Sequence, residues 1–375
     1  MSERTPKISV LMSAYNGSPK YLRESVDSIL SQSFTDFEFI IIDDCSSDDS
    51  WSILCDYATR DCRIRLLRNP QNMGLTKSLN KGLNLAQGQY IARQDADDIS
   101  MLNRFEKQFT WLTQHTETTL VSSEIQRIKP DGTFGNVSNR ACLSELLPWN
   151  LLFHNHLGGH SQVMFRRQPV LDLGGYNEAY RYSQDYELWC RLAKTGEIVI
   201  LPEVLLHQRF HSTSISSIKR AEQNKLVFSQ VTRNIEQLTG KVLLQKEAEN
   251  LHRLWSTNQK TQINRFPPTE MAKLLNQQLS FIYLAYVTNQ ADSIRQPLRT
   301  LIGQKFLDWA NRLSLRKQLL VKFKIYGFAL FWSPNLVVTQ WIEKLRNKAE
   351  LLTNRIPIYT IRNNIAEICK SAKVL

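Results

Sequence analysis

The 375-residue sequence has few cysteines, and their spacing excludes the common metal-finger motifs. Its six cysteines form no Cys-x-x-Cys pair, and a disulfide framework is not expected in a chain of this length, so we expect free thiols. Residues 1–7 are polar and lack the apolar core of a signal peptide, which favours a cytoplasmic location.

Long hydrophobic runs are also missing. Residues 325–342 carry no charge, but Ser333-Pro334-Asn335 interrupts them, and a membrane-spanning helix needs about 20 mostly apolar residues. Phe328, Phe331 and Trp332 lie between flanking lysines, a pattern typical of a segment in the membrane interface. The alternative is a buried helical hairpin whose charges are only solvated.

Negative charge is scarce near the end of the chain. Residues 291–375 contain 15 Lys and Arg against 5 Asp and Glu, which accounts for most of the net charge of +12. Such a basic region favours an anionic partner, and we expect an anionic membrane surface, with a peripheral location on it. The aromatic residues form no pattern typical of a stacking platform, so we expect no nucleic-acid binding.

The first half of the chain alternates apolar runs of strand length with apolar residues at helical spacing. We expect strands at residues 8–13, 38–42, 64–67, 90–93, 161–166 and 197–201, and helices at residues 21–32, 50–60, 74–87 and 183–194. This order predicts an α/β fold, with a mostly parallel sheet covered by helices. Strand signals almost vanish after residue 220, so we predict an α/β domain at residues 1–220 and a basic, mainly α-helical region at residues 221–375.

Acidic clusters follow two of the expected strands, at Asp43-Asp44 and at Asp95-Ala96-Asp97-Asp98. Ligands of such sheets bind beyond the carboxyl ends of the strands. Carboxylates two residues apart can share a hard divalent cation, and an Asp after a strand can accept hydrogen bonds from a nucleobase or a ribose. The alternative for either cluster is a turn that caps the next helix, although Ser47 and Asp48 suffice to cap the helix after the first cluster.

Single residues elsewhere have two interpretations each. Asp185 falls in the first turn of an expected helix, where it either suits the helix dipole or acts as a general base toward a hydroxyl group. A zinc site at His154, His156 and His160 lacks the further ligands that such a site needs. His211 is either an extra ligand to a bound cation or an ordinary surface histidine.

Five stretches in this order resemble glycosyltransferase family 2, a bacterial group with the GT-A fold. They are residues 8–16, 37–50, 72–82 and 88–98, and Gln184-Asp185 followed by Leu188-Trp189. The resemblance runs from about residue 8 to residue 217. It implies an inverting transferase that moves a sugar from a nucleotide-sugar donor, by default a UDP-sugar, to a glycan or lipid-linked acceptor in surface polysaccharide or lipopolysaccharide synthesis.

The resemblance also implies roles for individual residues. The nucleotide is expected to contact Ser13, Ala14, Tyr15, Asp43, Asp44, Lys77, Arg93 and Asp97. A divalent cation, Mg²⁺ or Mn²⁺, is expected at Asp95, Asp97 and Asp98, with His211 as a further candidate. Asp185 is expected to be the catalytic base, and the acceptor side is expected to include His160, Gln184 and Trp189. Gln184 departs from the family pattern, which often has Glu at this position.

Two other classes of protein compete with this interpretation. A nucleotidyltransferase can share a related sheet and acidic site, but usually has a glycine-rich, basic phosphate loop after its first strand, and residues 14–18, Ala-Tyr-Asn-Gly-Ser, do not form one. A non-catalytic protein that binds glycans or nucleic acid is the other alternative. The aspartates retained at both strand ends and at Asp185 argue against it.

Overall fold

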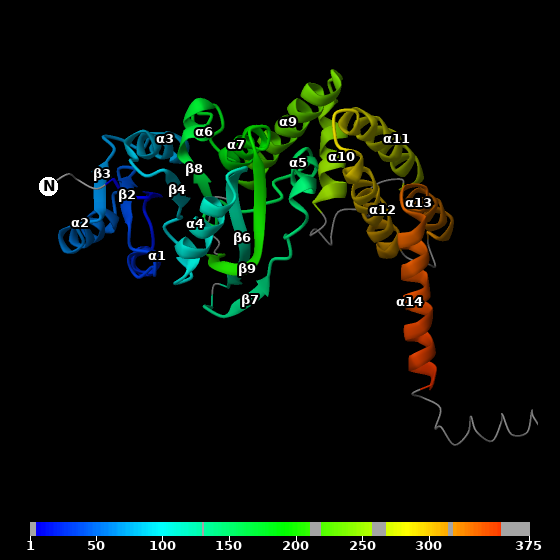
Figure 1. Ribbon diagram of the computed structural model, residues 1–375, viewed down its shortest axis with the longest axis horizontal. Helices are drawn as coiled ribbons and strands as arrows, with labels where there is room; N and C mark the ends of the chain where they lie inside the picture. Colours follow the sequence, from blue (N-terminus) through cyan, green and yellow to red (C-terminus); the bar gives the residue numbers. More distant parts are fainter. Residues whose placement is uncertain (1–4, 130, 211–218, 257–267, 314–317, 354–375) are drawn as a thin grey trace, which may run out of the picture. The chain divides into compact units, whose positions relative to one another are not determined.

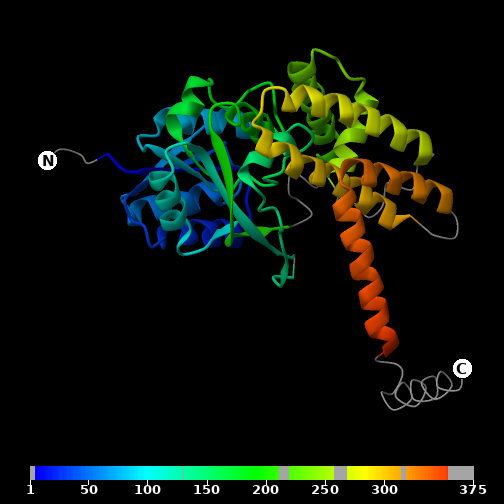
Figure 2. The same cartoon turned by 45° about the vertical axis from the view of Figure 1, so that its right-hand side comes forward.

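The computed structural model describes residues 5–129, 131–210, 219–256, 268–313 and 318–353. Packing divides the chain into two units, Met1–Asn258 and Gln259–Leu375, which Figures 1 and 2 show from two directions. The sheet and the helices around it form the first unit. The described residues of the second unit form helices.

The sheet of the first unit has the strand order β3-β2-β1-β4-β8-β6-β9-β5, with β7 paired to β6. Its strands are β1 Ile8–Ala14, β2 Phe37–Asp43, β3 Ile64–Arg68, β4 Tyr90–Arg93, β5 Ile99–Ser100, β6 Thr118–Ile128, β7 Phe134–Val137, β8 Met164–Arg166 and β9 Glu197–Arg209. The first four strands are parallel, so their carboxyl ends meet at one edge. β8 is antiparallel to both of its neighbours, β4 and β6.

Helices pack on both faces of this sheet. They are α1 Pro19–Leu30, α2 Ser50–Arg60, α3 Leu75–Leu85, α4 Arg104–Gln114, α5 Leu147–Leu151, α6 Arg167–Asp172, α7 Gln184–Leu192, α9 Arg220–Thr239 and α10 Gln245–Trp255. Successive side chains of a strand point to opposite faces, and both faces are buried here. This is why residues 39–42, Phe-Ile-Ile-Ile, form an unbroken apolar run rather than an alternating one.

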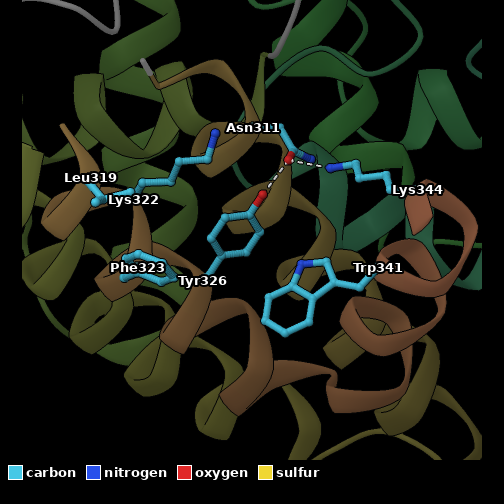
Figure 3. A pocket seen from close by; sticks show the side chains of 7 residues that line it. All are labelled: Asn311, Leu319, Lys322, Phe323, Tyr326, Trp341 and Lys344. Carbon is cyan, nitrogen blue, oxygen red and sulfur yellow. Dashed lines mark hydrogen bonds between the residues drawn. The ribbon is translucent and has the colours of Figure 1, made fainter. Parts of the chain in front are cut away.

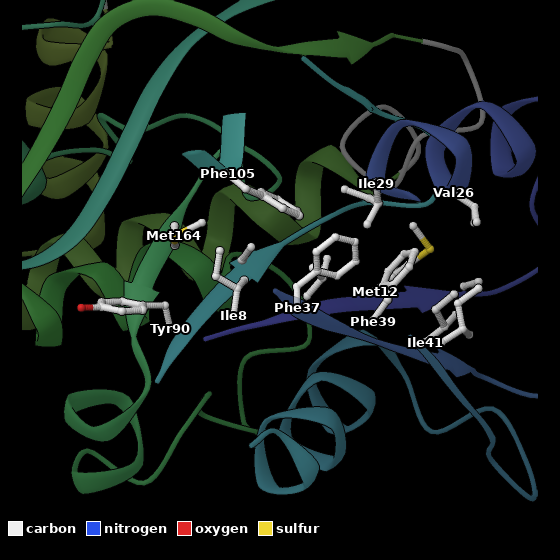
Figure 4. Close-up of a cluster of buried hydrophobic side chains, with 14 of the residues drawn as sticks. Ile8, Met12, Val26, Ile29, Phe37, Phe39, Ile41, Tyr90, Phe105 and Met164 are labelled. Atoms are coloured by element: carbon white, nitrogen blue, oxygen red, sulfur yellow. The ribbon is translucent and has the colours of Figure 1, made fainter. Parts of the chain in front are cut away.

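Two apolar layers make up the core. One face of β1 and β2 packs against α1 and α4, through Phe39, Val26 and Phe105 among others (Figure 4). The opposite face packs against α3 and α7, through side chains such as Leu83 and Trp189. The predicted fold class, a mostly parallel sheet between helices with a helical C-terminal region, is confirmed.

The division by packing lies further along the chain than the predicted boundary at residue 220. That residue is the first of α9, and α9 and α10 pack on the first unit. Asn234 donates to the Leu151 carbonyl at 3.0 Å, and Trp255 Nε1 donates to Asn150 Oδ1 at 2.7 Å. The two helices therefore extend the first unit to Asn258, while a functional boundary at residue 220 stays a prediction.

The second unit contains α11 Pro268–Val287, α12 Arg295–Arg312, α13 Leu319–Trp332 and α14 Pro334–Thr353. The uncharged stretch at residues 325–342 is split between α13 and α14, because Ser333, with φ −150° and ψ 85°, leaves the helical conformation before Pro334. Trp332 is buried and donates from Nε1 to Asn276 Oδ1 at 2.8 Å. No helix in the described ranges is both long and apolar enough to cross a membrane.

A buried polar network lies directly behind the end of β4. Arg104 of α4 is fully buried and donates to the carbonyls of Arg93 at 2.8 Å and Val163 at 3.0 Å. Its remaining bonds go to the side chains of Gln94, Ser100 and Gln108. Burial lowers the pKa of the Arg104 guanidinium to about 9. The network fixes the loop that carries Asp95, Asp97 and Asp98.

Replacing Arg104 should destabilise the first unit strongly. In Arg104→Met, buried carbonyl and amide oxygens lose their donors, and we expect a loss of about 3 kcal/mol or more in the free energy of unfolding. Arg60→Met is the matched control, because Arg60 forms an exposed ion pair with Asp56 within α2, and such pairs contribute less than about 1 kcal/mol. Urea unfolding followed by circular dichroism measures both, and equal losses would contradict this account of the network.

Candidate active site

The loops after β1 and β2 are joined at the carboxyl edge of the sheet. The Asn16 N–H donates to Ser46 Oγ at 3.1 Å, and Asn16 Oδ1 accepts from the Ser47 N–H at 2.9 Å. Asn16 and Cys45 both have positive φ, which turns the chain sharply at each loop. Tyr15 is consequently half exposed beside these turns, whereas Ser13 and Ala14 end β1 with less exposure.

Asp43 is the last residue of β2 and is fully buried. Its Oδ2 atom lies 3.1 Å from Arg68 Nε and accepts from the Ser46 N–H at 3.1 Å. Its Oδ1 atom has no hydrogen-bond partner among the described residues. A buried carboxylate oxygen without a donor is costly, so Oδ1 is a candidate acceptor for a ligand N–H group.

Asp44 organises the loop that leads into α3. Its Oδ1 atom accepts from Asn69 Nδ2 at 2.7 Å and from the Met73 N–H at 2.8 Å, and its Oδ2 atom accepts from the Gly74 N–H at 2.8 Å. Gly74 has φ +87°, a conformation that favours glycine. Asp44, which the sequence predicts to bind the nucleotide, thus also holds residues 69–74 in place.

The acidic cluster after β4 is held by arginines. Arg93 is fully buried, and its Nη2 atom lies 2.5 Å from Asp95 Oδ1. Asp98 is buried, and its Oδ1 atom accepts from the Arg209 N–H at 2.9 Å. Burial and the neighbouring Asp97 and Asp95 charges raise the pKa of Asp98 well above its ordinary value. Asp95 and Asp97 are only half-buried, so they are the more accessible carboxylates of the cluster.

The donor set fits a hard cation that takes few protein ligands. No group of three or more His, Cys, Asp or Glu side chains placed to hold a metal occurs among the residues described. Asp95 and Asp97 offer carboxylate oxygens, and Mg²⁺ commonly takes one or two carboxylates and completes its shell with water and substrate phosphate oxygens. His211, the further candidate ligand, lies outside the described residues.

Asp185 lies in the first turn of α7, after Ser183, whose φ is +57°. Its Oδ2 atom accepts from Asn155 Nδ2 at 2.8 Å. Burial raises the pKa of Asp185 to about 6, and the negative charge of Asp95 adds to this increase. The hydrogen bonds from the Tyr186 N–H and from Asn155 lower the pKa but do not cancel the effect of burial. The Asp95 charge thus reaches Asp185, which makes the acidic cluster and Asp185 candidates for one site.

The residues expected on the acceptor side are all buried. His160 is buried, and its Nε2 atom lies 2.8 Å from the Tyr176 hydroxyl. Burial lowers the pKa of His160 well below its ordinary value, so the ring is neutral. Trp189 is fully buried with its ring centroid 5.8 Å from that of His160, and Gln184 is buried as well. Any role of these side chains toward an acceptor therefore stays a prediction.

The structure brings other residues to the site that sequence reasoning missed. Asn155 contacts Asp185, and Ser161 Oγ accepts from the Asp95 N–H at 2.7 Å. Both come from the stretch around His154, His156 and His160, in which the sequence analysis named only His160 as a site residue. Of the predicted nucleotide contacts, Lys77 lies exposed on α3, whereas Arg93 is buried and reaches the site through Asp95.

The sheet and the helices around it have the GT-A fold of glycosyltransferases. Residues 1–349 of TarS from S. aureus, solved in complex with UDP-GlcNAc, match with a TM-score of 0.52, covering 86% of this chain and 89% of that chain at 16% identity. A second structure of TarS 1–349 matches with a TM-score of 0.50. Because the sequence identity is this low, the comparison with TarS shows a shared fold only.

Sequence comparisons define the family. The family model described as Glycosyl transferase family 2 matches residues 9–184. An uncharacterized glycosyltransferase of Haemophilus influenzae is 31% identical over 252 residues, which cover 64% of this chain and 76% of that protein. The chain belongs to glycosyltransferase family 2 and is a glycosyltransferase, as its sequence motifs predicted.

Two further relatives have more specific names. An Escherichia coli protein named UDP-Gal:alpha-D-GlcNAc-diphosphoundecaprenol beta-1,3-galactosyltransferase is 30% identical over 234 residues, covering 62% of this chain and 83% of that protein. The putative teichuronic acid biosynthesis glycosyltransferase TuaG of Bacillus subtilis is 31% identical over 239 residues, covering 64% of this chain and 92% of that protein.

Substitution of Asp44 tests its structural role directly. In Asp44→Asn the amide cannot accept all three hydrogen bonds, and we expect a loss of about 2 kcal/mol in the free energy of unfolding. Amide hydrogen exchange at Met73 and Gly74 should accelerate, as measured by mass spectrometry. Asp56→Asn on the exposed side of α2 is the control. Unchanged exchange at Met73 and Gly74 in Asp44→Asn would show that the loop is held otherwise.

Proposed function

We propose that this chain is an inverting glycosyltransferase that moves a sugar from a UDP-sugar to a hydroxyl group of a lipid-linked glycan during surface polysaccharide or lipopolysaccharide synthesis. The observation that carries the proposal is the pair formed by Asp185 and the acidic cluster. A desolvated carboxylate lies within electrostatic reach of Asp95, at the edge where the parallel strands end. A base on one side and a donor site on the other is what direct displacement requires.

The proposed donor side is the edge formed by β1, β2 and β4. Tyr15 is half exposed beside the loops after β1 and β2, and Asp43 has a buried oxygen without a partner in the described chain. We assign Asp43 Oδ1 as the acceptor for the uracil N–H, with Asp44 holding the neighbouring loop. The UDP-Gal in the name of the Escherichia coli relative supports a uridine nucleotide.

A divalent cation belongs to this proposal. Asp95 and Asp97 would hold it together with diphosphate oxygens, while Asp98 anchors the loop from inside. When bound, such a cation supplies positive charge beside the departing diphosphate. Arg93 keeps Asp95 in place by donating to its Oδ1 atom.

Asp185 takes the role of general base. Its carboxylate accepts the proton of the acceptor hydroxyl while that oxygen attacks the anomeric carbon, and the nucleoside diphosphate leaves from the opposite face. Because attack and departure occur on opposite faces in one displacement, the anomeric configuration inverts. Asn155 positions the base by donating to Oδ2.

The name of one relative and the basic second unit support the lipid-linked acceptor. The Escherichia coli relative is named for an acceptor built on diphosphoundecaprenol. A peripheral location on an anionic membrane surface, mediated by the basic helical region, would bring the enzyme to such an acceptor.

The base assignment predicts a particular pH dependence. Asp185 acts as a base only when ionised, so kcat/KM should fall as the pH drops through about 6. Asp185→Asn should abolish transfer while UDP binding persists. Asn155→Ala removes a hydrogen bond that stabilises the carboxylate, so the acid limb should move to higher pH. Retained transfer in Asp185→Asn would refute the base assignment.

The donor assignment predicts which nucleotide binds. In calorimetric titrations with UDP, dTDP and GDP in the presence of Mn²⁺, UDP should bind most tightly. A chelator should weaken this binding at least tenfold, about 1.4 kcal/mol, because the diphosphate loses its bridge to the protein. Asp43→Asn should weaken UDP binding in the presence of Mn²⁺, and Asp97→Asn should reduce the effect of the chelator. If the folded protein binds none of these nucleotides, the donor site is misassigned.

A further inference from the structure

The second unit contains a cavity of about 560 Å³, within the size range of sites for small ligands. It lies among α12, α13 and α14, and Figure 3 shows the side chains that line it. They are Asn311, Leu319, Lys322, Phe323, Tyr326, Trp341 and Lys344. The lining therefore combines two ammonium groups with three aromatic rings.

The polar side of the cavity is cationic. Asn311 Oδ1 accepts from the Tyr326 hydroxyl at 2.6 Å and from Lys344 Nζ at 2.8 Å, as Figure 3 shows. Lys322 Nζ donates to the Leu313 carbonyl at 3.2 Å. Within the described ranges neither lysine forms an ion pair with a carboxylate, and the sequence of α13 contains no Asp or Glu. Each ammonium keeps donors for an anionic group.

Exposed apolar side chains adjoin the cationic groups on the same two helices. Phe323 of α13 is 60% exposed and Trp341 of α14 is 42% exposed. Beside them in the sequence, Leu320 and Ile342 are 79% and 59% exposed. Exposed Leu, Phe, Ile and Trp with interleaved lysines are typical of surfaces that lie in the headgroup region of a membrane.

We propose that this cavity binds the phosphate headgroup of an anionic phospholipid, with Lys322 and Lys344 facing the phosphate and Phe323, Leu320 and Trp341 entering the boundary of the acyl chains. The charge of α13 and the apolar rim favour this occupant. A free phosphate would use the lysines but would leave the apolar rim in water. The inference uses the lipid-linked acceptor of the proposed function as the reason for docking, but the binding itself does not depend on it.

Vesicle sedimentation with the full chain tests the proposal. The chain should pellet with phosphatidylcholine vesicles that contain phosphatidylglycerol and only weakly with phosphatidylcholine alone. The double variant Lys322→Gln, Lys344→Gln should bind at least tenfold more weakly, since each basic residue contributes about a factor of five near an anionic surface. Phe323→Gln should weaken binding as well. The control is the double variant Lys225→Gln, Lys241→Gln, which removes the same charge elsewhere. Lys225 lies on α9 and Lys241 just after it, and both are exposed, so vesicle binding should stay within about twofold of the unaltered chain.

Several outcomes would overturn the proposal. One is equal binding to both kinds of vesicle, and another is undiminished binding by the double lysine variant. A third is a chain that binds inorganic phosphate but no vesicles, with phosphate binding unchanged in Phe323→Gln. Self-association in sedimentation velocity that Phe323→Gln abolishes would reassign the surface to a second copy of this chain. Circular dichroism confirms that each variant folds, which we expect because the altered side chains lie at least partly on the surface.

Sugar transfer to a soluble acceptor, measured without vesicles, separates this inference from the proposed function. The cavity variants should retain it at the unaltered rate. Absence of transfer in every chain would count against the proposed function, and vesicle binding would still decide the role of the cavity.

Discussion

The three carboxylates after β4 depend on a set of buried arginines and on Gln94. Asp95, Asp97 and Asp98 repel one another within four residues, and burial makes that repulsion costly. Arg93 pairs with Asp95, the Arg209 backbone donates to Asp98, and Arg209 Nε donates to the Asp97 carbonyl at 3.0 Å. The protein itself therefore holds the acidic loop in place. Arg104 of α4 joins the Arg93 carbonyl to that of Val163, just before β8, and Arg209 is the last residue of β9. The shape of the loop therefore depends on contacts from several elements.

The sequence predicted those elements whose burial shows in local pattern. The apolar runs of β1 and β2 mark strands with two buried faces, and the spacing of Leu79 and Leu83 marks α3. It did not predict β6, because this strand buries polar side chains. Ser122, Ser123 and Glu124 are all buried there, and Glu124 accepts from the backbone N–H groups of residues 140 and 141. Such compensation comes from distant parts of the chain and leaves no periodic signal.

The candidate site shows the same division. The placement of acidic residues after strands could be predicted, since the carboxyl ends of parallel strands share an edge. Their partners could not be predicted, because Asn155 and Ser161 approach from more than 25 residues away.

The uncharged stretch near the end of the chain shows the same limit of prediction from sequence. Trp332, expected at a membrane interface, is buried against Tyr283 of α11, while Phe323 just before the uncharged stretch is exposed. A pattern of apolar residues does not show which of them a neighbouring helix covers.

The protein surrounds Asp43, Asp44 and Asp185 in different ways. A carboxylate has roughly four acceptor positions. Asp44 fills three of them with Asn69 and two backbone N–H groups, so its first task is to hold a loop. Asp43 leaves one oxygen without a donor in the described chain, which suits an acceptor for a ligand N–H. Burial raises the pKa of Asp185 to about 6 even though the Tyr186 N–H and Asn155 donate to it, and at that pKa a carboxylate can take up and release a proton near neutral pH. The same residue type thus meets three different surroundings: donors hold Asp44 on both oxygens, Asp43 keeps one buried oxygen without a donor in the described chain, and burial raises the pKa of Asp185.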